Sequence, residues 1–530
     1  MTNPSFPIVL FLSTVLLLSF FTFISANEPF LGCLHSNSNP KYPISSVIYS
    51  RSNSSYSSVL QTYIRNLRFN ESTTQKPQLI ITALHVSHIQ AAVVCGKQHD
   101  MQMKIRSGGH DYEGLSYVSE NPNFFVLDMF NLRAINVSEE NETAWVQTGA
   151  TLGEVYYRIA EKSNVHGFPA GVCPTVGVGG HMTGGGYGTM MRKYGLSVDN
   201  ILDAQVVDVN GRFLDRASMG EDLFWAITGG GGSSFGVVVA FKIKLVRVPP
   251  KVTVFRVDKT YHQNAVNLAY KWQQIAYKLP DDLFIRMTLA VVNGSGIEGK
   301  TIMATFRALF LGDSTKLLPI MEKFYPELGV QQKDCIELTW VESIVYWTEF
   351  PNGTSIDALL SRVPQSLVYH KRKSDYLTKP MPKAGIELLF QKMVELESPF
   401  IQFNPYGGRM SQIPWFEKPY PHRAGYITKM QYSTEWNEGG AEAANRYKQL
   451  VRDLYNFMTP YVSKSPRQAF LNYRDIDLGV NHQGNRSYIE GAAFGRKYFK
   501  DNFDRLVKIK TNVDPDNFFR NEQSIPVHRS

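Results

Sequence analysis

The sequence has no lysine- or arginine-rich tract, although its 55 Lys and Arg exceed its 47 Asp and Glu, for a net charge of +8 over 530 residues. Nucleic acid is therefore a poor candidate partner, and the charge supports only a mild attraction to anionic surfaces such as acidic polysaccharide. Internal repeats and low-complexity segments are also absent. Hydrophobic residues make up 43% and charged residues only 19%, which excludes a disordered chain. The length predicts two domains, or one α/β domain with a large insert.

Basic residues are missing from the N-terminus, where no Lys or Arg precedes Lys41. Residues 7–24 are almost wholly apolar, and Ile24-Ser25-Ala26 offers a small-residue cleavage site. This pattern predicts a cleaved secretory signal over residues 1–26; the alternative is a retained anchor helix, for which the run is short. No later stretch is long and apolar enough to span a bilayer. We therefore expect a secreted protein, extracellular or in the cell wall, with the vacuole as an alternative destination.

Secretion makes the few cysteines and the glycosylation motifs informative. Among the four cysteines, Cys33 and Cys95 flank the first folded segment and are predicted to form a disulfide. Cys335 is expected to be a buried, inert thiol, whereas Cys173 sits in a glycine-rich loop. Seven Asn-x-Ser/Thr motifs are predicted glycosylation sites: Asn53, Asn70, Asn136, Asn141, Asn293, Asn352 and Asn485.

The pattern of apolar residues changes at Pro249-Pro250. Before this point, residues 77–247 combine short buried strands with helical segments, as α/β domains do. After it, apolar and polar residues alternate as in half-buried antiparallel strands, and long amphipathic stretches predict helices that cover the sheet. The predicted strands of this second part are 252–258, 283–292 and 301–310, and the predicted helices are 317–327 and 441–458.

Glycine is concentrated in two loops, residues 106–114 (RSGGHDYEG) and residues 171–188. Glycine lets backbone N–H groups approach a phosphate closely and tolerates positive φ. Neither loop is a Walker A motif, because no Gly-Lys-Ser/Thr follows, and neither fits the Rossmann fingerprint. From the residues alone, the loops predict a dinucleotide or phosphate cradle, with purely structural turns as the alternative.

These loops, together with the tail FFRNEQSIP at residues 518–526, resemble the plant berberine-bridge-enzyme-like family of the vanillyl-alcohol-oxidase superfamily. The resemblance covers nearly the whole chain from Cys33 onward. It implies an α+β fold in three parts. A PCMH-type FAD-binding domain of two subdomains would span residues 77–248. A substrate domain with an antiparallel sheet covered by helices would span 249–465, and residues 466–530 would return to the FAD domain.

The resemblance also implies that FAD is attached twice, through His110 in RSGGH and Cys173 in GVCPT. A neutral imidazole and a thiolate are nucleophilic enough to bond to the edge of an oxidised flavin. Two such bonds raise the flavin's potential and favour the uptake of a hydride. The remaining residues expected to contact FAD are Arg106, Ser107, Gly108, Gly109, Asp111, Thr148, Gly149, Gly171, Gly177, Gly179, Gly180, His181, Gly184, Gly185, Gly236 and Val238.

A strand at residues 425–432 is expected to face the substrate. Alternation places Ile427, Lys429 and Gln431 on one face, and this mixture is unusual for a core. In the family, the lysine and glutamine of this strand help to activate a tyrosine base, which corresponds to Tyr473. A phenol titrates near pH ~10, so it needs a cation such as Lys429 to stabilise the phenolate. Tyr112 and Tyr187 match the family's other aromatic positions at the ring.

The resulting prediction is a secreted oxidase that transfers a hydride from an alcohol, such as a monolignol, an oligosaccharide or a phenolic metabolite, to FAD. Val176 lies where the family has an oxygen gate, and valine there predicts that dioxygen is reduced to hydrogen peroxide. The alternative is an oxidative cyclase or cycloaddition enzyme of specialised metabolism. The family's alkaloid-cyclising branch carries a glutamate on the strand where this chain has Lys429 and Gln431. No metal site is predicted, and a monomer is expected.

Overall fold

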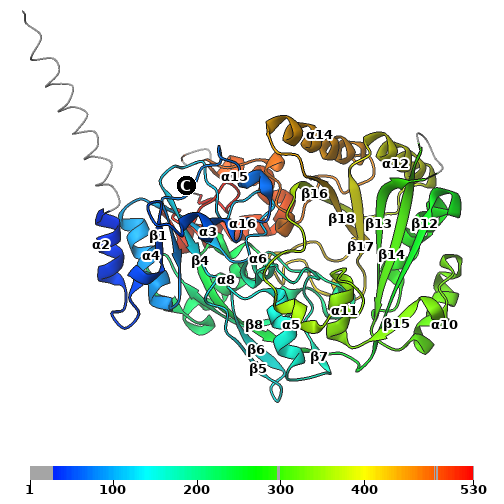
Figure 1. Ribbon diagram of the computed structural model, residues 1–530, viewed down its shortest axis with the longest axis horizontal. Helices are drawn as coiled ribbons and strands as arrows, with labels where there is room; N and C mark the ends of the chain where they lie inside the picture. Colours follow the sequence, from blue (N-terminus) through cyan, green and yellow to red (C-terminus); the bar gives the residue numbers. More distant parts are fainter. Residues whose placement is uncertain (1–27, 295–298, 483, 485–486, 529–530) are drawn as a thin grey trace, which may run out of the picture.

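The computed structural model describes residues 28–294, 299–482, 484 and 487–528. The predicted signal over residues 1–26 and the motif at Asn485 lie outside the described residues. The chain has the expected α+β fold, built around three β-sheets (Figure 1). Two of these sheets belong to the N-terminal half of the chain, and the third and largest follows them in sequence.

The first sheet has four strands in the order β1-β2-β4-β3. Strands β2, β4 and β3 are parallel to one another, and β1 pairs antiparallel with β2. The predicted disulfide Cys33–Cys95 is confirmed and ties helix α2 to helix α4. The strands are β1 (Ile48–Ser50), β2 (Leu79–Thr82), β3 (Gln102–Arg106) and β4 (Phe124–Asp128), and the helices are α2 (Glu28–Asn37), α3 (Tyr56–Gln61) and α4 (Val86–Gln98).

The second sheet is antiparallel, with the order β5-β6-β10-β8-β9. Its central strand β10 begins with five buried apolar residues, as expected for a strand covered on both faces. Helix α5 starts where Thr151 and Glu154 cap its first turn reciprocally. The elements are β5 (Ile135–Ser138), β6 (Thr143–Gln147), α5 (Leu152–Ala160), α6 (Val178–Thr183), α7 (Met191–Tyr194), β8 (Ile201–Val207), β9 (Phe213–Leu214), α8 (Arg216–Ile227) and β10 (Val237–Lys244), and a small ribbon pairs β7 (His166–Gly167) with β11 (Val246–Arg247).

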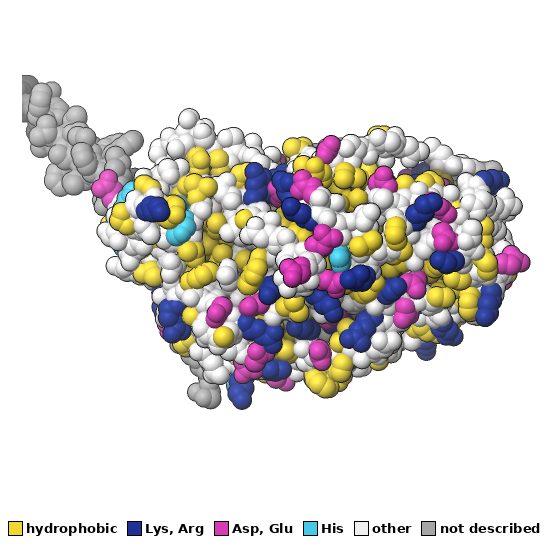
Figure 2. All heavy atoms as spheres, turned by 90° about the horizontal axis from the view of Figure 1, so that it is seen from below, with side chains coloured by type: hydrophobic (Ala, Val, Ile, Leu, Met, Phe, Trp, Pro, Cys, Tyr) yellow, Lys and Arg dark blue, Asp and Glu magenta, His cyan; other side chains and the backbone are white. Residues whose placement is uncertain are grey.

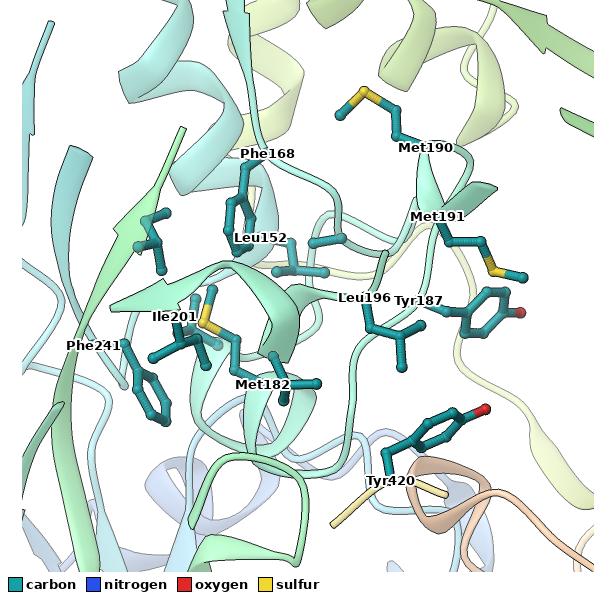
Figure 3. Close-up of a cluster of buried hydrophobic side chains, with 14 of the residues drawn as sticks. Leu152, Phe168, Met182, Tyr187, Met190, Met191, Leu196, Ile201, Phe241 and Tyr420 are labelled. Atoms are coloured by element: carbon teal, nitrogen blue, oxygen red, sulfur yellow. The ribbon is translucent and has the colours of Figure 1, made fainter. Parts of the chain in front are cut away.

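Part of the core beside this sheet is shown in Figure 3. Leu152, Phe168 and Met182 pack together there, and all three are almost fully buried. Tyr187 and Tyr420 lie at one side of the same cluster, with their hydroxyl groups at its margin (Figure 3). The glycine-rich segment that contains Tyr187 is therefore anchored by apolar packing, which fixes where its polar end lies.

The third sheet is antiparallel and seven-stranded, with the order β15-β12-β14-β13-β17-β18-β16. One face, which includes Ile285 and Met287, packs under helices, while Phe284 and Arg286 point to the other side. The strands are β12 (Val252–Thr260), β13 (Leu283–Asn293), β14 (Lys300–Phe310), β15 (Cys335–Leu338), β16 (Tyr369–Leu377), β17 (Phe400–Pro405) and β18 (Thr428–Trp436). The helices of this part are α9 (Ala265–Ile275), α10 (Ser314–Phe324), α11 (Trp340–Trp347), α12 (Lys383–Leu396), α13 (Arg409–Gln412) and α14 (Ala441–Phe457).

Two expectations for this sheet are wrong. Cys335 is only partly buried, because it opens the edge strand β15 and contacts the Gln331 carbonyl. Ile427 precedes β18 and packs in the helix-covered core with Met430 and Tyr432, not on the face of Lys429. Strict alternation fails there because the regular strand begins one residue later, at Thr428.

The C-terminal segment contains α15 (Ser487–Phe499) and α16 (Asn502–Val513) and lies against the N-terminal part of the molecule (Figure 1). Two buried lysines make this connection. Lys510 Nζ donates to the Ser234 carbonyl (2.8 Å), and Lys104 Nζ pairs with Glu522 (2.7 Å). The chain end is therefore fastened to the sheets formed by its beginning.

Positively and negatively charged side chains are mixed on the surface of the molecule. Lys and Arg are interspersed with Asp and Glu on the face seen in Figure 2. The side chains of the six described asparagines in glycosylation motifs are exposed, so burial excludes none of them: Asn53, Asn70, Asn136, Asn141, Asn293 and Asn352. Within the described part of the chain, no helix has the length and apolar character needed to cross a membrane.

Candidate active site

A cavity of about 640 Å³ lies where the two glycine loops, β10 and the uncovered face of the third sheet meet. This volume falls in the range of about 300–1,000 Å³ typical of small-molecule and cofactor sites. Glycines and backbone line one part of its wall, and polar and aromatic side chains line the other. Residues predicted to contact FAD that line the cavity are Ser107, Gly108, Gly109, His110, Asp111, Thr148, Gly171, Cys173, Gly177, Gly179, Gly180, His181, Gly184, Gly236 and Val238.

The two glycine loops cross in direct backbone contact. A Cβ on Gly177 would lie 2.2 Å from the Gly108 nitrogen, and a Cβ on Gly108 would lie 2.3 Å from the Gly177 nitrogen. Ser107 Oγ also donates to the Thr148 carbonyl (2.6 Å), which holds the first loop against the second sheet. Only glycine permits this approach, so the sequence sets the spacing between the loops.

The crossing brings His110 and Cys173 to the same hydroxyl group. His110 Nε2 lies 2.9 Å from Thr175 Oγ1, and Cys173 Sγ lies 3.7 Å from that oxygen. Desolvation in the cavity wall, reinforced by Arg65 and Arg372, lowers the pKa of His110 to about 3. The imidazole is therefore neutral at physiological pH, which is the form that can act as a nucleophile.

Three residues expected to contact FAD lie outside the cavity wall. Arg106 is fully buried and binds the Asp128 carboxylate and the carbonyls of Val59 and Leu60. Gly149 packs against the Met129 carbonyl, and Gly185 packs against aromatic rings. Motif membership does not distinguish a residue that touches the ligand from one that supports the loop. Arg106 holds the first glycine loop in place by a buried, hydrogen-bonded ion pair.

His181 also has a supporting contact. Its Nε2 accepts from the Gly171 N–H (3.2 Å), while burial and Lys429 lower its pKa to about 3. A neutral His181 therefore links helix α6 back to the start of the second loop. Its backbone carbonyl accepts from Asn472 Nδ2 (2.8 Å), which connects this loop to the segment that carries Tyr473.

Three tyrosines meet at the side of the cavity formed by the third sheet. The hydroxyl groups of Tyr187 and Tyr473 make a short hydrogen bond. The Tyr112 ring is stacked on the Tyr473 ring, with 5.4 Å between centroids and 25° between planes. Gln431 Nε2 donates to the Tyr112 hydroxyl (2.7 Å). The four residues Tyr112, Tyr187, Gln431 and Tyr473 all line the cavity.

Lys429 lies behind these rings and not beside a phenol oxygen. Its Nζ is 2.8 Å from the Tyr187 ring centroid, 4.1 Å from that of Phe470 and 4.4 Å from that of Tyr473. It is buried and has no hydrogen-bond partner within the described residues. Burial, together with Arg286, lowers the pKa of Lys429 well below its usual value, although the surrounding ring faces favour a cation. Lys429 is thus close to Tyr473, but over its ring face.

Burial also raises the pKa of Tyr473 well above 10.0, and Tyr187 and Tyr112 add to this shift. The Arg286 guanidinium acts in the opposite direction and lowers the pKa of Tyr473. Arg286 lines the cavity, and its Nε donates to Asn404 Oδ1 (2.8 Å). Sequence reasoning missed this arginine because β13 reads as an ordinary alternating strand, in which an arginine on the polar face signals nothing.

Other cavity residues were also not expected. Arg372 lies over the Tyr112 ring (4.8 Å) and donates to Ser433 Oγ (3.0 Å). Arg307 lines the wall beside Trp347. One missed group had a visible signal, because the run of four glycines at residues 229–232 resembles the other glycine loops. Gly231, Gly232 and Ser233 of this segment line the cavity.

The residues of this cavity fit an FAD group. The glycines of the wall let a bound phosphate or ring approach the backbone closely, and a neutral imidazole and a thiol lie within reach of one hydroxyl. The polar and aromatic part provides groups that can bind and deprotonate a small molecule. FAD would lie along the two loops, beside His110 and Cys173.

Comparisons with known proteins agree with this reading. The FAD binding domain family matches residues 77–216, and the "berberine and berberine like" family matches residues 469–526. Berberine bridge enzyme-like 8 of Arabidopsis thaliana is 58% identical over 523 residues, which cover 97% of this chain and 99% of that protein.

Solved structures give the same result. BBE-like #28 from Arabidopsis thaliana matches with a TM-score of 0.88 and 45% identity, covering 94% of this chain and 99% of that one. The grass pollen allergen Phl p 4, described as a glucose dehydrogenase, matches with a TM-score of 0.89 and 45% identity, covering 94% of this chain and 100% of that one. This chain, with its FAD-binding domain, belongs to the berberine-bridge-enzyme-like family of oxidoreductases.

Proposed function

We propose that this protein is a secreted oxidase that converts an alcohol to a carbonyl compound with FAD attached through both His110 and Cys173. One observation carries the proposal: the cavity lined by these two residues is also lined by the hydrogen-bonded Tyr187–Tyr473 pair. A cofactor attachment site and a proton-accepting group therefore face the same space. When bound, FAD would supply the acceptor for a hydride from the alcohol carbon, and the two electrons of that hydride, with its proton and the proton lost by the substrate hydroxyl, would reduce dioxygen to hydrogen peroxide.

Tyr473 is the proposed base. As a phenolate it would accept the proton of a substrate hydroxyl, while the Tyr187 hydroxyl donates to the same oxygen. Because burial raises the pKa of Tyr473, the phenolate requires nearby positive charge. Arg286 supplies one charge, and Lys429, which lies over the ring of Tyr473, supplies another when its amine is protonated. The ring faces around Lys429 would stabilise that ammonium.

The substrate is proposed to bind against the third sheet, which supplies Gln402, Gln431 and Arg286 to the wall. Gln431 would hold the Tyr112 hydroxyl in place for a contact to the substrate. These groups suit a hydroxyl-bearing small molecule or oligosaccharide, in keeping with the glucose dehydrogenase activity attributed to Phl p 4.

Dioxygen is the proposed electron acceptor, with Val176 as its gate. Val176 lines the cavity between Thr175 and Gly177. Wild-type Phl p 4.0202 is described as a glucose dehydrogenase, and a variant of Phl p 4 with one isoleucine replaced by valine is described as a glucose oxidase. In that relative, the loss of one methylene group accompanies the change of acceptor, which supports valine as the residue of an oxidase.

Secretion is supported by the Cys33–Cys95 disulfide, since disulfides persist in oxidising compartments. The sequence pattern of residues 1–26 and the exposed asparagines of six glycosylation motifs agree with it. We propose that the protein acts as a monomer, because its cavity is completed by residues of one chain.

The function is tested with purified protein and a panel of monolignols, sugars and oligosaccharides. We expect one or more alcohols to bleach the flavin without oxygen and to yield hydrogen peroxide with oxygen. Tyr473→Phe should abolish most of the bleaching, whereas Tyr447→Phe, a partly exposed tyrosine on α14, should not. Bleaching without peroxide would indicate a dehydrogenase, and a ring-closed product would indicate the cyclase alternative.

A further inference from the structure

A group of five buried or partly buried charged residues lies directly behind the tyrosines of the cavity. This ion cluster consists of Glu113, Lys371, Lys373, Asp475 and Asp477. Its two lysines lie on β16, and at most 2% of either side chain is exposed. Arg68 and Arg452 pair with the cluster at its margins. Strand β16 therefore presents two ammonium groups behind the site, while its intervening residue, Arg372, faces the cavity.

The two lysines make different connections. Lys371 Nζ binds Glu113 and Asp475 (2.7 Å to Asp475 Oδ1). Lys373 Nζ binds Asp475 and Asp477 (2.9 Å to Asp477 Oδ2) and, within the described residues, makes no ion pair with the first glycine loop. Of the two lysines, Lys371 alone therefore joins the loop that carries Tyr112 to the segment that carries Tyr473. Arg474 makes a second ionic link between the same two segments, from its Nε to Asp111 Oδ2 (3.3 Å).

The two carboxylates that Lys371 binds, Glu113 and Asp475, lie close to the cavity tyrosines in the sequence. Tyr112 directly precedes Glu113, and Tyr473 lies two residues before Asp475. The rings of these tyrosines stack on each other although 361 residues separate them in the chain. The Lys371 ammonium group thus bridges, from the buried side, two segments whose rings form one wall of the cavity.

Stability alone does not account for this arrangement. Apolar side chains of similar volume often stabilise a core as well as a buried ion pair does, because charges lose hydration when buried. An ion cluster differs from apolar packing because its hydrogen bonds have fixed directions and fixed partners. It can therefore hold two segments in one relative position. Asp475 is held further by its backbone, since its N–H donates to the Tyr498 hydroxyl (3.1 Å) and its carbonyl accepts from Gln523 Nε2 (2.8 Å).

We propose that Lys371 is a positioning residue that sets the stacking of Tyr112 on Tyr473 and thereby aligns the base with the substrate; this role rests on the proposed function of Tyr473. Lys371 itself does not line the cavity. Lys373 provides a matched control, because it shares the strand, the charge, the burial and the Asp475 partner but not the link to Glu113.

The test compares Lys371→Met, Lys373→Met and the double variant Lys371→Met/Glu113→Gln with wild type and Tyr473→Phe. Crystal structures give the distance between the Tyr112 and Tyr473 rings. Anaerobic stopped-flow with D-glucose and coniferyl alcohol as probes gives the rate of flavin reduction at saturation and the apparent affinity. Thermal unfolding reports the loss of stability, which we expect in both single lysine variants.

For Lys371→Met, we expect the ring separation to grow by more than about 0.5 Å and the reduction rate to fall up to about 100-fold, with affinity nearly unchanged. Lys373→Met should keep the wild-type ring separation and rate. The double variant should regain thermal stability, because position 113 no longer carries a buried charge that has lost its lysine partner, but not the rate.

Equal rate losses in the two single variants, or recovery of the rate in the double variant, would show that the cluster acts through stability alone. An unchanged ring separation in Lys371→Met would overturn the proposal on its own. If Tyr473→Phe reduces as fast as wild type, or if no alcohol of the panel bleaches the wild-type flavin, the proposed function fails. The ring separation in the crystals then still decides the positioning role of Lys371.

Discussion

Replacing Gly177 by alanine should prevent the flavin from being attached to His110 and Cys173 at the same time, so that only one of the two bonds forms. The new Cβ would lie 2.2 Å from the Gly108 nitrogen and from Ser107 Oγ, whereas ordinary contact begins at 3.4 Å. The two loops must therefore separate by about 1.2 Å, more than the ~0.5 Å within which a reactive site must be held. Gly177 has φ −73° and ψ 138°, which alanine adopts freely, so steric overlap is the only cause. Such overpacking typically costs about 1–3 kcal/mol, which the fold can withstand.

The assay is flavin fluorescence on a denaturing gel, followed by peptide mass spectrometry. We expect Gly177→Ala to retain flavin through one residue only, because His110 and Cys173 no longer meet at Thr175. Gly32→Ala in helix α2, where nothing lies within 4 Å of the new Cβ, is the matched control and should carry both bonds. Full double attachment in Gly177→Ala would refute the reasoning that loop contact sets this spacing.

Four further outcomes are expected. Wild-type protein should remain yellow after acid denaturation, and replacing His110 or Cys173 should leave one bond and slower flavin reduction; flavin released by acid from wild type contradicts this. Tyr473→Phe should slow anaerobic flavin reduction by about 10²–10⁴-fold, and Lys429→Met by less. Val176→Leu should slow reoxidation by dioxygen in stopped-flow while leaving reduction by substrate nearly intact. Finally, burial lowers the pKa of His422 from 6.5 to about 3. As pH falls, His422 therefore binds a proton in the unfolded chain before it does so in the folded protein. The free energy of unfolding should then drop by about 1.4 kcal/mol per pH unit between those values, and His422→Phe should remove this one-proton slope in denaturant titrations at several pH values.

Much of the fold could be predicted because its signals are local. Alternation over residues 283–292 and 301–310 predicted β13 and β14 to within one residue at each end. The amphipathic stretch 441–458 likewise predicted α14 almost to its ends. A strand face or a helix stripe is determined by nearby residues, so its pattern is visible in the sequence.

The candidate site was harder to predict because it depends on distant contacts. The glycine loops identified the cavity, but nothing in their sequence says that Arg106 turns away from it to bind Asp128. The Lys371 link joins Glu113 to Asp475, residues with no shared local pattern. Lys429 was expected near the phenol of Tyr473, but its place over the Tyr187 ring follows from packing that no local pattern encodes.

The order of the site residues along the chain has a consequence for biosynthesis. A ribosome makes His110 and Cys173 long before Tyr473, and the tail that fastens to Lys104 through Glu522 is made last. A nascent or truncated chain that ends before Tyr473 would present the cofactor loops without the base. If the protein is the proposed secreted oxidase, peroxide production would await completion of the polypeptide, which would spare the secretory machinery an oxidant while the chain is still being made.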